Sequence, residues 1–380
     1  MIKVGVLKES GSEKRVILLP EGVRTLQEMK TAVWVEAGAG KEAYFQDRAY
    51  IEAGARIAEK GEIIENTSVI IKINPPTSEE RNAMKEGTVL IAILQPLSNI
   101  SLIDELAKKN ITTFSLDCIP RTTRAQTMDV LSSMATVAGY KAVLLAASHL
   151  PTFFPMFITA AGTVTPAKVL ILGAGVAGLQ AIATARRLGA VVEVFDVRAD
   201  VKEEVETLGA KFVEVEGAVD EARAGGYAVE QTGEFQQKQK QLIHNHAVKS
   251  DVIITAAQIP GKAAPKLISE ETVDAMKPGS VIVDLAASSG GNCEVCKNNE
   301  TIVKNGVTII GESNLPATMP VDASKMLGKN IINFLKLIIN KGELNLDFKD
   351  DIIKNTCITQ NKEIINESVK NAFMKTAKTF

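Results

Sequence analysis

The sequence predicts an α/β protein with two Rossmann-like, doubly wound domains, a cleft between them and long helices that link them. Three observations predict this fold class. Short apolar runs alternate with amphipathic segments in the first third of the chain, a second alternating set begins at Lys168, and a long helical pattern follows each set. Such alternation is typical of a parallel sheet with helices on both faces.

The first set contains short apolar runs rich in β-branched residues, which are expected to form buried strands at 2–7, 32–37, 69–74, 88–94 and 111–116. Amphipathic helices are expected between them at 20–29, 78–85 and 102–109. A longer helical pattern begins at Met128 and runs to about Leu150.

The second set predicts strands at 168–173, 191–196, 211–215, 251–256, 280–286 and 307–312, followed by a long apolar helix at 323–340. One more strand candidate, 356–360, lies in a lysine- and asparagine-rich tail that we expect to return to the first domain. The predicted domains are therefore residues 1–126 with 325–380, and residues 127–324.

The composition is that of a soluble globular protein, with 380 residues, 46% of them hydrophobic, and a formal net charge of −2. Because there is no basic surplus, nucleic-acid binding is not expected. Four cysteines in so long a chain make no disulfide framework, which fits a reducing compartment. The first residues, MIKVGVLKES, lack the apolar core of a signal peptide, so none is expected.

One stretch, residues 142–167, contains no Asp, Glu, Lys or Arg and is long enough to span a bilayer. Pro151, Pro155 and Gly162 interrupt it, however. We therefore expect a buried helix followed by an ordered loop, with no direct membrane insertion.

No metal site is expected. Cys293 and Cys296 form a lone C-x-x-C, and no second Cys or His pair is spaced to complete a zinc site. The pair also lacks a thioredoxin-like context. His244 and His246 are two positions apart on a probable helix and would face different directions, and His149 is expected to be a packed or capping residue.

The strongest motif is the G-x-G-x-x-G of Gly173, Gly175 and Gly178, which lies between an apolar strand and an alanine-rich helix. The first glycine permits a tight turn, the second lets the backbone approach a pyrophosphate, and the third allows close packing of the helix on the strand. The helix N-terminus then faces the phosphates. A glycine-rich turn without a ligand is the alternative.

The next predicted strand ends in Asp196, about 20 residues after the motif, where an acid accepts a hydrogen bond from the ribose 2′-hydroxyl. The same carboxylate would repel a 2′-phosphate, so NAD is favoured over NADP. Arg198, two residues further on, weakens this preference because an arginine accommodates a 2′-phosphate.

These motifs resemble the NAD(H)-binding component of the proton-translocating nicotinamide nucleotide transhydrogenases. The resemblance covers nearly the whole chain and is most specific in PRTTRAQTMDVLSS, in AAGTVTPAKVLILGAGVAGLQ and in MKPGSVIVDLA. The fold is shared with alanine dehydrogenases, so the two groups must be separated by the chemistry of their sites.

Alanine dehydrogenases use a histidine and an aspartate to handle protons near the substrate. The resemblance places Gln95 and Ser288 at those positions. Glutamine cannot relay protons at neutral pH, and a serine is no general base without a partner. This difference favours a transhydrogenase. Arg15 and Lys72 match the basic residues that bind substrate in alanine dehydrogenases, but they could equally be structural ion-pair residues.

In the transhydrogenases, the loop that RTTRAQTMDVLSS resembles surrounds the nicotinamide and its ribose. The matching residues here are Arg121, Gln126, Asp129 and Ser132. Direct hydride transfer between two nicotinamides needs no proton at the reacting carbons, only rings held close in a dry pocket. The alternative is that Asp129 and Ser132 only cap a helix while Arg121 and Arg124 lie on the surface.

The resemblance also assigns the remaining nucleotide contacts. The segment AGGYA, with Gly226 and Tyr227, is similar to a mobile loop that closes over bound nucleotide and would expel water. An ordinary surface loop is the alternative for this segment. The other positions expected to line the nucleotide are Val176, Val197, Gln239, Ala257 and Gln258.

The resemblance implies that this chain binds NAD(H), and that hydride passes directly to or from NADP(H) on a separate subunit. Membrane-embedded subunits would couple this transfer to proton translocation. The implied assembly is a homodimer, cytoplasmic and peripheral on the inner (plasma) membrane through its partners. Two alternatives stay open: a soluble NAD-dependent alanine or related amino-acid dehydrogenase, and an NAD(H) sensor without a redox partner.

Overall fold

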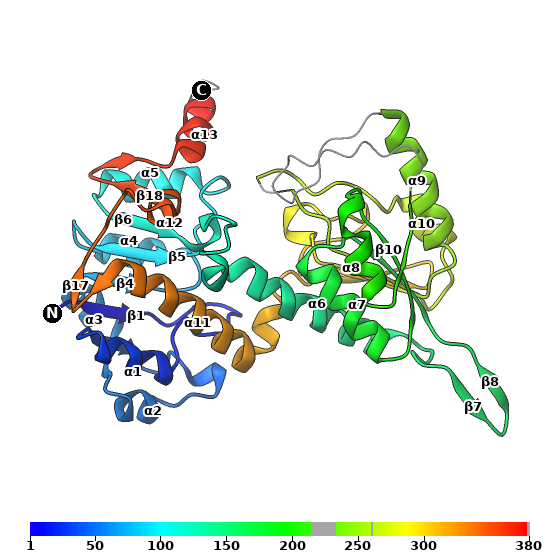
Figure 1. Cartoon of the computed structure of the whole chain (residues 1–380), viewed down its shortest axis with the longest axis horizontal. Coiled ribbons are helices and arrows are strands. Elements are labelled where there is room, and N and C mark those ends of the chain that lie inside the picture. The colour runs from blue at the N-terminus through cyan, green and yellow to red at the C-terminus, as the bar shows by residue number, and fades with distance from the viewer. Residues whose placement is uncertain (215–232, 260, 378–380) are drawn as a thin grey trace. The chain divides into compact units, whose positions relative to one another are not determined.

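The computed structural model describes residues 1–214, 233–259 and 261–377, and these form two compact units (Figure 1). The first unit comprises Met1–Met134 and Ala317–Phe380, and the second comprises Ala135–Pro316. The limit after Met134 falls inside helix α6 (Val130–His149), and the limit after Pro316 falls just before helix α11 (Pro320–Ile338). Each limit lies eight residues from the predicted one (134 − 126 and 324 − 316).

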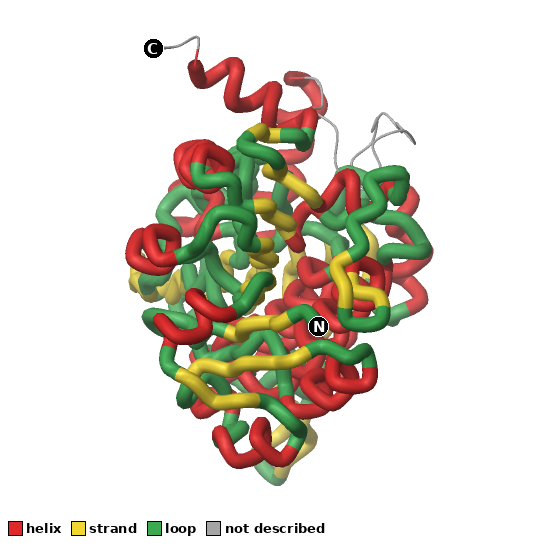
Figure 2. The backbone as a smooth tube through the Cα atoms, turned by 90° about the vertical axis from the view of Figure 1, so that its left-hand side faces the viewer, coloured by secondary structure: helices red, strands yellow, loops and turns green. Residues whose placement is uncertain are grey.

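The first unit contains an eight-stranded sheet in the order β19-β18-β6-β5-β4-β1-β2-β3. The strands of the chain are the yellow segments in Figure 2. The six strands from β6 to β3 pair in parallel, whereas β18 pairs antiparallel with β6 and with β19. The C-terminal strands β18 and β19 therefore belong to the sheet of the first unit. The strands are β1 (Lys3–Val6), β2 (Ala32–Glu36), β3 (Arg56–Ala58), β4 (Val69–Ile71), β5 (Val89–Ala92), β6 (Thr112–Ser115), β18 (Cys357–Gln360) and β19 (Glu363–Ile364).

Helices connect the parallel strands, as parallel pairing requires. These helices are α1 (Pro20–Glu28), α2 (Asp47–Glu52), α3 (Lys60–Asn66), α4 (Ser78–Ala83) and α5 (Ile100–Lys108). The first unit also contains α11, α12 (Asp351–Thr356) and α13 (Glu367–Ala377). Helix α4 begins with a capping box, in which the Thr77 hydroxyl accepts from the Glu80 amide and the Glu80 carboxylate accepts from the Thr77 amide.

The second unit contains a seven-stranded sheet in the order β11-β10-β9-β12-β13-β15-β14, parallel except for the edge strand β14. The reversal of strand order at β9 and β12 is typical of a dinucleotide-binding sheet. Its strands are β9 (Lys168–Leu172), β10 (Val191–Phe195), β11 (Lys211–Phe212), β12 (Val252–Thr255), β13 (Val281–Asp284), β14 (Thr301–Lys304) and β15 (Val307–Ile310). Its further helices are α7 (Val176–Arg187), α8 (Lys202–Thr207), α9 (Gly233–Ala247) and α10 (Glu270–Ala275).

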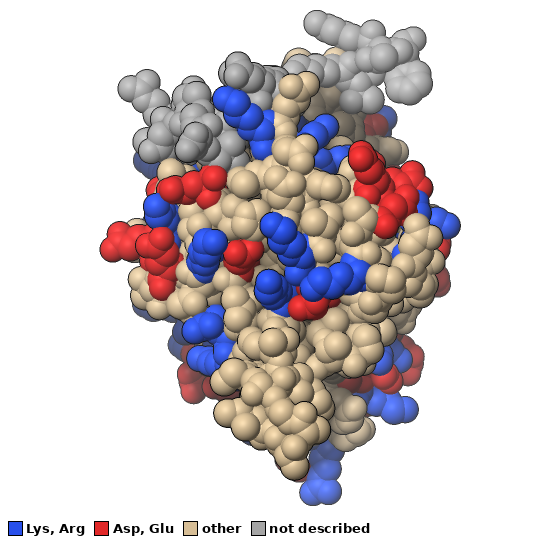
Figure 3. Space-filling model, turned by 90° about the vertical axis from the view of Figure 1, so that its right-hand side faces the viewer, with Lys and Arg blue, Asp and Glu red and all other residues tan. Residues whose placement is uncertain are grey.

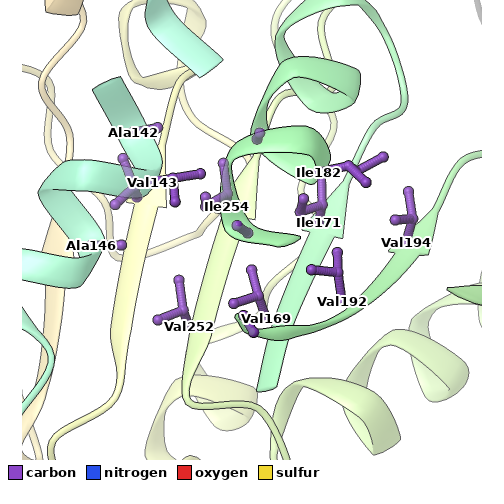
Figure 4. Packing of buried hydrophobic residues seen from close by; sticks show 14 of the residues in the cluster. Ala142, Val143, Ala146, Val169, Ile171, Ile182, Val192, Val194, Val252 and Ile254 are labelled. Carbon is purple, nitrogen blue, oxygen red and sulfur yellow. The ribbon is translucent and has the colours of Figure 1, made fainter. Parts of the chain in front are cut away.

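Helix α6 packs on this sheet through small side chains. Ala142, Val143 and Ala146 are fully buried in the same cluster as Val169 of β9 and Val252 of β12 (Figure 4). By length and hydropathy, α6 is the one helix in the described part of the chain that could cross a membrane. The predicted helix is therefore present, but it is only partly buried: 39% of its most apolar stretch of 18 residues is buried, and Leu131 and Tyr140 are exposed.

The stretch after α6 differs from the prediction. An ordered loop was expected there, but Phe157–Thr159 (β7) and Gly162–Val164 (β8) form an antiparallel hairpin that extends from the second unit (Figure 1). Almost every residue of the hairpin is exposed. Burial periodicity, on which strand prediction depends, is therefore absent from this segment.

Two basic residues of the first unit are held in buried ion pairs. Lys72 donates to Glu80 at 2.7 Å, and both side chains are 1% exposed. Arg15 binds Glu13 through two bonds, Nε to Oε1 at 2.7 Å and Nη2 to Oε2 at 2.5 Å. This arrangement favours the structural role for Arg15 and Lys72.

Replacing Glu80 by Gln is expected to lower the free energy of unfolding by about 3–5 kcal/mol, because the buried Lys72 loses the carboxylate to which it donates. Burial raises the pKa of Glu80, but hydrogen bonds from Lys72 and the Thr77 amide outweigh it and hold the folded-state pKa below 4.5. The pair therefore stabilises the fold above the unfolded-state pKa, and its contribution is lost as pH falls through the folded-state pKa.

Urea unfolding of the native chain and of Glu80→Gln, at pH values from neutral to acidic, measures the contribution of the Lys72–Glu80 pair to stability. The stability of the native chain should fall more steeply below pH 4.5 than that of Glu80→Gln. Glu52→Gln, which breaks the exposed pair with Arg48, is the control and should be nearly silent. Equal losses in the two variants would show that burial of the Lys72 pair does not matter.

Candidate nucleotide site and the segment 121–132

The glycine motif forms the turn between β9 and α7. Gly173 has a φ of 105°, which an L side chain rarely adopts, and a Cβ there would lie 3.1 Å from the Ala256 carbonyl carbon. A Cβ on Gly178 would lie 1.9 Å from the Gly173 carbonyl oxygen, so only glycine allows α7 to pack this closely.

Gly175 differs from its two neighbours in the motif. A Cβ on Gly175 would meet no atom within 4 Å, and its φ of −76° suits any residue. The protein itself therefore does not require glycine there. The space beside this backbone, at the N-terminus of a twelve-residue helix, fits the close approach of a phosphate group.

Asp196 follows β10 and lies against the same turn. Its Oδ2 accepts from the Ala174 amide at 2.7 Å and from Arg198 Nη2 at 3.0 Å. Its Oδ1 accepts from the Arg198 amide at 2.9 Å and from Arg198 Nε at 3.0 Å. The carboxylate thus links the glycine turn to Arg198, whose pKa it raises chiefly through these hydrogen bonds.

The segment after β12, which carries Ala257 and Gln258, is braced by a residue that no sequence motif indicates. Asn292 is fully buried; its Oδ1 accepts from the Ala257 amide at 3.1 Å, and its Nδ2 donates to the carbonyl oxygens of Ala257 at 2.9 Å and Pro265 at 2.8 Å. Gln258 Nε2 donates to the Leu285 carbonyl at 3.0 Å. An asparagine that pairs with a distant backbone has no local sequence signal.

The other residues expected near the nucleotide lie in different settings. Val176 is exposed at the first turn of α7, Val197 is partly buried beside Asp196, and Gln239 on α9 is buried. Gly226 and Tyr227 lie outside the described residues, as does the rest of the AGGYA segment.

The segment 121–132 lies in the first unit. Gln126 starts the short 3-10 helix η3 (Gln126–Met128), is exposed, and makes no side-chain hydrogen bond to any other residue that the structure describes. Asp129 lies directly before α6, where its Oδ1 accepts from the Ser132 amide at 2.9 Å and its Oδ2 from the Ser132 hydroxyl at 2.5 Å. Asp129 and Ser132 therefore do cap the helix; Arg121 is exposed.

Arg124 is exposed, as in the alternative for this segment, but it is held in ion pairs at the start of α12. Its Nη1 donates to Asp350 Oδ2 at 2.5 Å, its Nη2 to Asp350 Oδ1 at 2.9 Å, and Nη2 also bonds to Asp351. Asp350 in turn caps α12 by accepting from the amides of Ile352 and Ile353. The contact joins positions 226 residues apart, so no local pattern indicates it.

The positions matched to proton-handling residues offer no obvious acid or base. Gln95 has a φ of 47° and donates its amide to Asp117 at 3.4 Å, and Ser288 is exposed in the 3-10 helix Ala287–Ser289. Asp284, near Ser288 in sequence, is fully buried and accepts from the Thr255 hydroxyl and the amides of Ala286 and Cys293.

The two cysteines of the C-x-x-C have pKa values raised by burial, to about 11 for Cys293 and about 12 for Cys296. Both are therefore thiols at neutral pH and poor nucleophiles. Within the described ranges, no group of three or more His, Cys, Asp or Glu side chains could hold a metal ion.

Comparison with known proteins gives a consistent result. Residues 5–138 match the alanine dehydrogenase/PNT N-terminal domain family, and residues 142–367 match the corresponding C-terminal domain family. The chain is 44% identical over 382 residues to the first part of NAD(P) transhydrogenase subunit alpha of Rhodospirillum rubrum, covering 97% of this chain and 99% of that protein.

Solved structures agree. The structure of transhydrogenase from Sinorhizobium meliloti has a TM-score of 0.88 and 42% identity, and the match covers 96% of this chain and all of that one. An L-alanine dehydrogenase structure has a TM-score of 0.84 but only 26% identity, over 98% of this chain and 99% of that one. The predicted fold of two Rossmann-like domains is confirmed, and the transhydrogenases are the nearer of the two groups.

The glycine geometry predicts different results for two alanine substitutions. Gly178→Ala should lower the melting temperature by at least about 3 °C, because its Cβ collides with a backbone oxygen that cannot move freely. Gly175→Ala should leave the melting temperature within about 2 °C of the native value and weaken NADH binding at least about tenfold. Thermal unfolding and NADH fluorescence titration measure both effects. Native-like NADH affinity in Gly175→Ala would mean that no phosphate approaches this turn.

Proposed function

Because this chain belongs to the alanine dehydrogenase/PNT family, among the NAD(P) transhydrogenase alpha subunits, we propose that it is the NAD(H)-binding component of a proton-translocating transhydrogenase. One observation carries the proposal: a dinucleotide cradle occurs in a chain in which Gln95 and Ser288, the residues at the proton-handling positions of alanine dehydrogenases, provide neither an acid nor a base. Oxidation of an amino acid requires proton removal from substrate, whereas hydride transfer between two nicotinamides does not.

In this proposal, bound NADH supplies the hydride and the protein supplies position. The turn at Gly173–Gly178 and the N-terminus of α7 hold the pyrophosphate, and Asp196 accepts from the ribose. The exposed amide of Gln126 offers both a donor and an acceptor to the nicotinamide carboxamide. Arg121, Asp129 and Ser132 complete the ring-positioning segment, with Asp129 and Ser132 made rigid by the α6 cap.

A preference for NAD(H) over NADP(H) rests on Asp196 and Arg198 together. The Asp196 carboxylate accepts from the Ala174 amide and, through three further hydrogen bonds, from Arg198. A ribose hydroxyl therefore competes with the guanidinium for the carboxylate. The carboxylate in turn prevents the guanidinium from receiving a 2′-phosphate.

The proposed partners follow from the reaction. A second component must carry NADP(H), and membrane-embedded subunits must couple hydride transfer to proton movement. This chain would then be peripheral on the cytoplasmic side of the inner membrane. The R. rubrum relative is named as only the first part of an alpha subunit, which fits a divided complex.

A homodimer is also part of the proposal, and the hairpin β7–β8 supports it. Ile158 is 80% exposed, and Phe153 packs edge-to-face on Phe157 at 4.9 Å with both rings exposed. The hairpin is an uncharged projection from the lower part of the face shown in Figure 3. An uncharged apolar arm suits a second copy of itself, because an isologous contact brings identical surfaces together without like-charge repulsion.

Opposite shifts in nucleotide preference are expected at the Asp196–Arg198 pair. Asp196→Ala frees the guanidinium, so the ratio of the NADPH Kd to the NADH Kd should fall at least about tenfold. Arg198→Ala leaves an unshielded carboxylate, so the same ratio should rise. Fluorescence titration of each variant with both nucleotides measures the ratios. A shift in the same direction for both variants would contradict the pairing argument.

The hairpin proposal predicts that Ile158→Glu shifts the protein from dimer to monomer, because the introduced charges would be buried against each other. Sedimentation equilibrium measures the mass directly. Val303→Glu, on the exposed side of edge strand β14, is the control and should leave the mass unchanged. A dimer of undiminished affinity in Ile158→Glu would exclude the hairpin as the interface.

The function itself is tested by two assays on the purified chain. With NAD⁺ and L-alanine, no NADH should form. When the chain is mixed with an NADP(H)-binding transhydrogenase component, NADH should reduce NADP⁺. Alanine-dependent NADH production by the chain alone would favour the amino-acid dehydrogenase. NADH binding without any transfer in the mixture would favour the sensor.

A further inference from the structure

Two side chains of α11 converge on one carbonyl oxygen in the segment 121–132. Asn330 Nδ2 lies 2.9 Å from the Thr127 oxygen, and Asn333 Nδ2 lies 3.2 Å from the same atom. Positions three apart share a helix face, so both amides reach η3 from one side. Thr127 is the middle residue of η3 and directly follows Gln126.

The amide of Asn330 is poorly explained by stability alone. Asn330 is 7% exposed, and its Oδ1 is buried without a hydrogen-bond partner in the described part of the chain. The reverse amide orientation would bring two oxygens together at Thr127. Because an unsatisfied buried oxygen is destabilising and asparagine is a weak helix former, an apolar residue would favour the fold at least as well.

The same stretch of chain is fastened on the other side of Gln126. Arg124 binds Asp350 and Asp351 at the start of α12, while Ala125 and Met128 are buried. Anchors therefore precede and follow Gln126, whose own side chain stays exposed. Contacts of the neighbouring residues therefore hold the backbone at Gln126, and its side-chain amide takes no part in them.

We propose that Asn330 and Asn333 are positioning residues for hydride transfer, which act through the Thr127 carbonyl to fix the place of Gln126. This inference rests on the proposed function, in which Gln126 orients the nicotinamide. Transfer between two rings is sensitive to a displacement of about 1 Å, which can cost about 100-fold in rate. In the proposed function the pyrophosphate is held by the Gly173–Gly178 turn, which lies outside this segment, so the affinity for NADH should depend on it less than the transfer rate does.

The experiment measures single-turnover hydride transfer from NADH to NADP⁺ in the chain mixed with an NADP(H)-binding component, together with the NADH Kd and the melting temperature. Asn330→Ala/Asn333→Ala should slow transfer about 30- to 100-fold and change the NADH Kd less than about threefold. Asn333→Ala alone, at a partly exposed position, should slow transfer about fivefold with the melting temperature within about 2 °C.

Two further variants separate positioning from structure. Asn333→Gln keeps an amide donor and should restore transfer to within about threefold of the native rate. Asn66→Ala removes a comparable asparagine-to-carbonyl bond, to Glu62, elsewhere in the first unit and should leave transfer unchanged. If the double variant fails to fold, the Asn333→Ala and Asn333→Gln pair decides.

Native transfer rates in Asn333→Ala and the double variant would overturn the inference. So would parallel losses of transfer, NADH affinity and melting temperature, which indicate a structural role. Gln126→Asn distinguishes the failure of this inference from that of its premise. Slow transfer in Gln126→Asn together with native rates in the Asn330 and Asn333 variants would refute only the positioning role of the two asparagines. Native rates in all of these variants would refute the role of Gln126 as well.

Discussion

The close approach of helix α7 to the end of strand β9 is the constraint on which the nucleotide site depends. Gly178 packs against the Gly173 carbonyl with no room for a side chain, which allows the helix to begin directly after the turn. The Gly173 amide donates to the Phe195 carbonyl at 2.8 Å, and the Ala174 amide donates to Asp196. These contacts hold the turn, the N-terminus of α7 and Asp196 together. Because Gly175 has no side chain, the backbone at this point stays open to a ligand.

In the first unit, the basic groups that could bind a substrate are already paired. Arg15 and Lys72, which could bind a substrate carboxylate, are both held in buried ion pairs. Within the segment 121–132, the exposed polar groups include the neutral side-chain amide of Gln126. A neutral amide on a segment that is anchored on both sides can orient a ring but cannot move protons, which suits hydride transfer between nicotinamides better than amino-acid oxidation.

Much of this could be predicted from the sequence, because it depends on local pattern. The buried parallel strands appear as continuous apolar runs, and the Gly173–Gly178 turn has fixed spacing. Strands β3 and β14 were missed because edge strands are half exposed and show no such run. The ion pair of Arg124 with Asp350 and the bonds of Asn330 and Asn333 to Thr127 join residues more than 200 positions apart, and only the folded chain brings them together.

The central claim is that hydride passes directly from one nicotinamide to the other. The most direct test uses NADH deuterated at its transferable C4 position, mixed in ordinary water with this chain, NADP⁺ and an NADP(H)-binding component. The account predicts that the NADPH formed carries the deuterium in full, at a rate that titrates with no side chain of this protein. Loss of the label to water would contradict it, because the reacting hydrogen would then have passed through an exchangeable group.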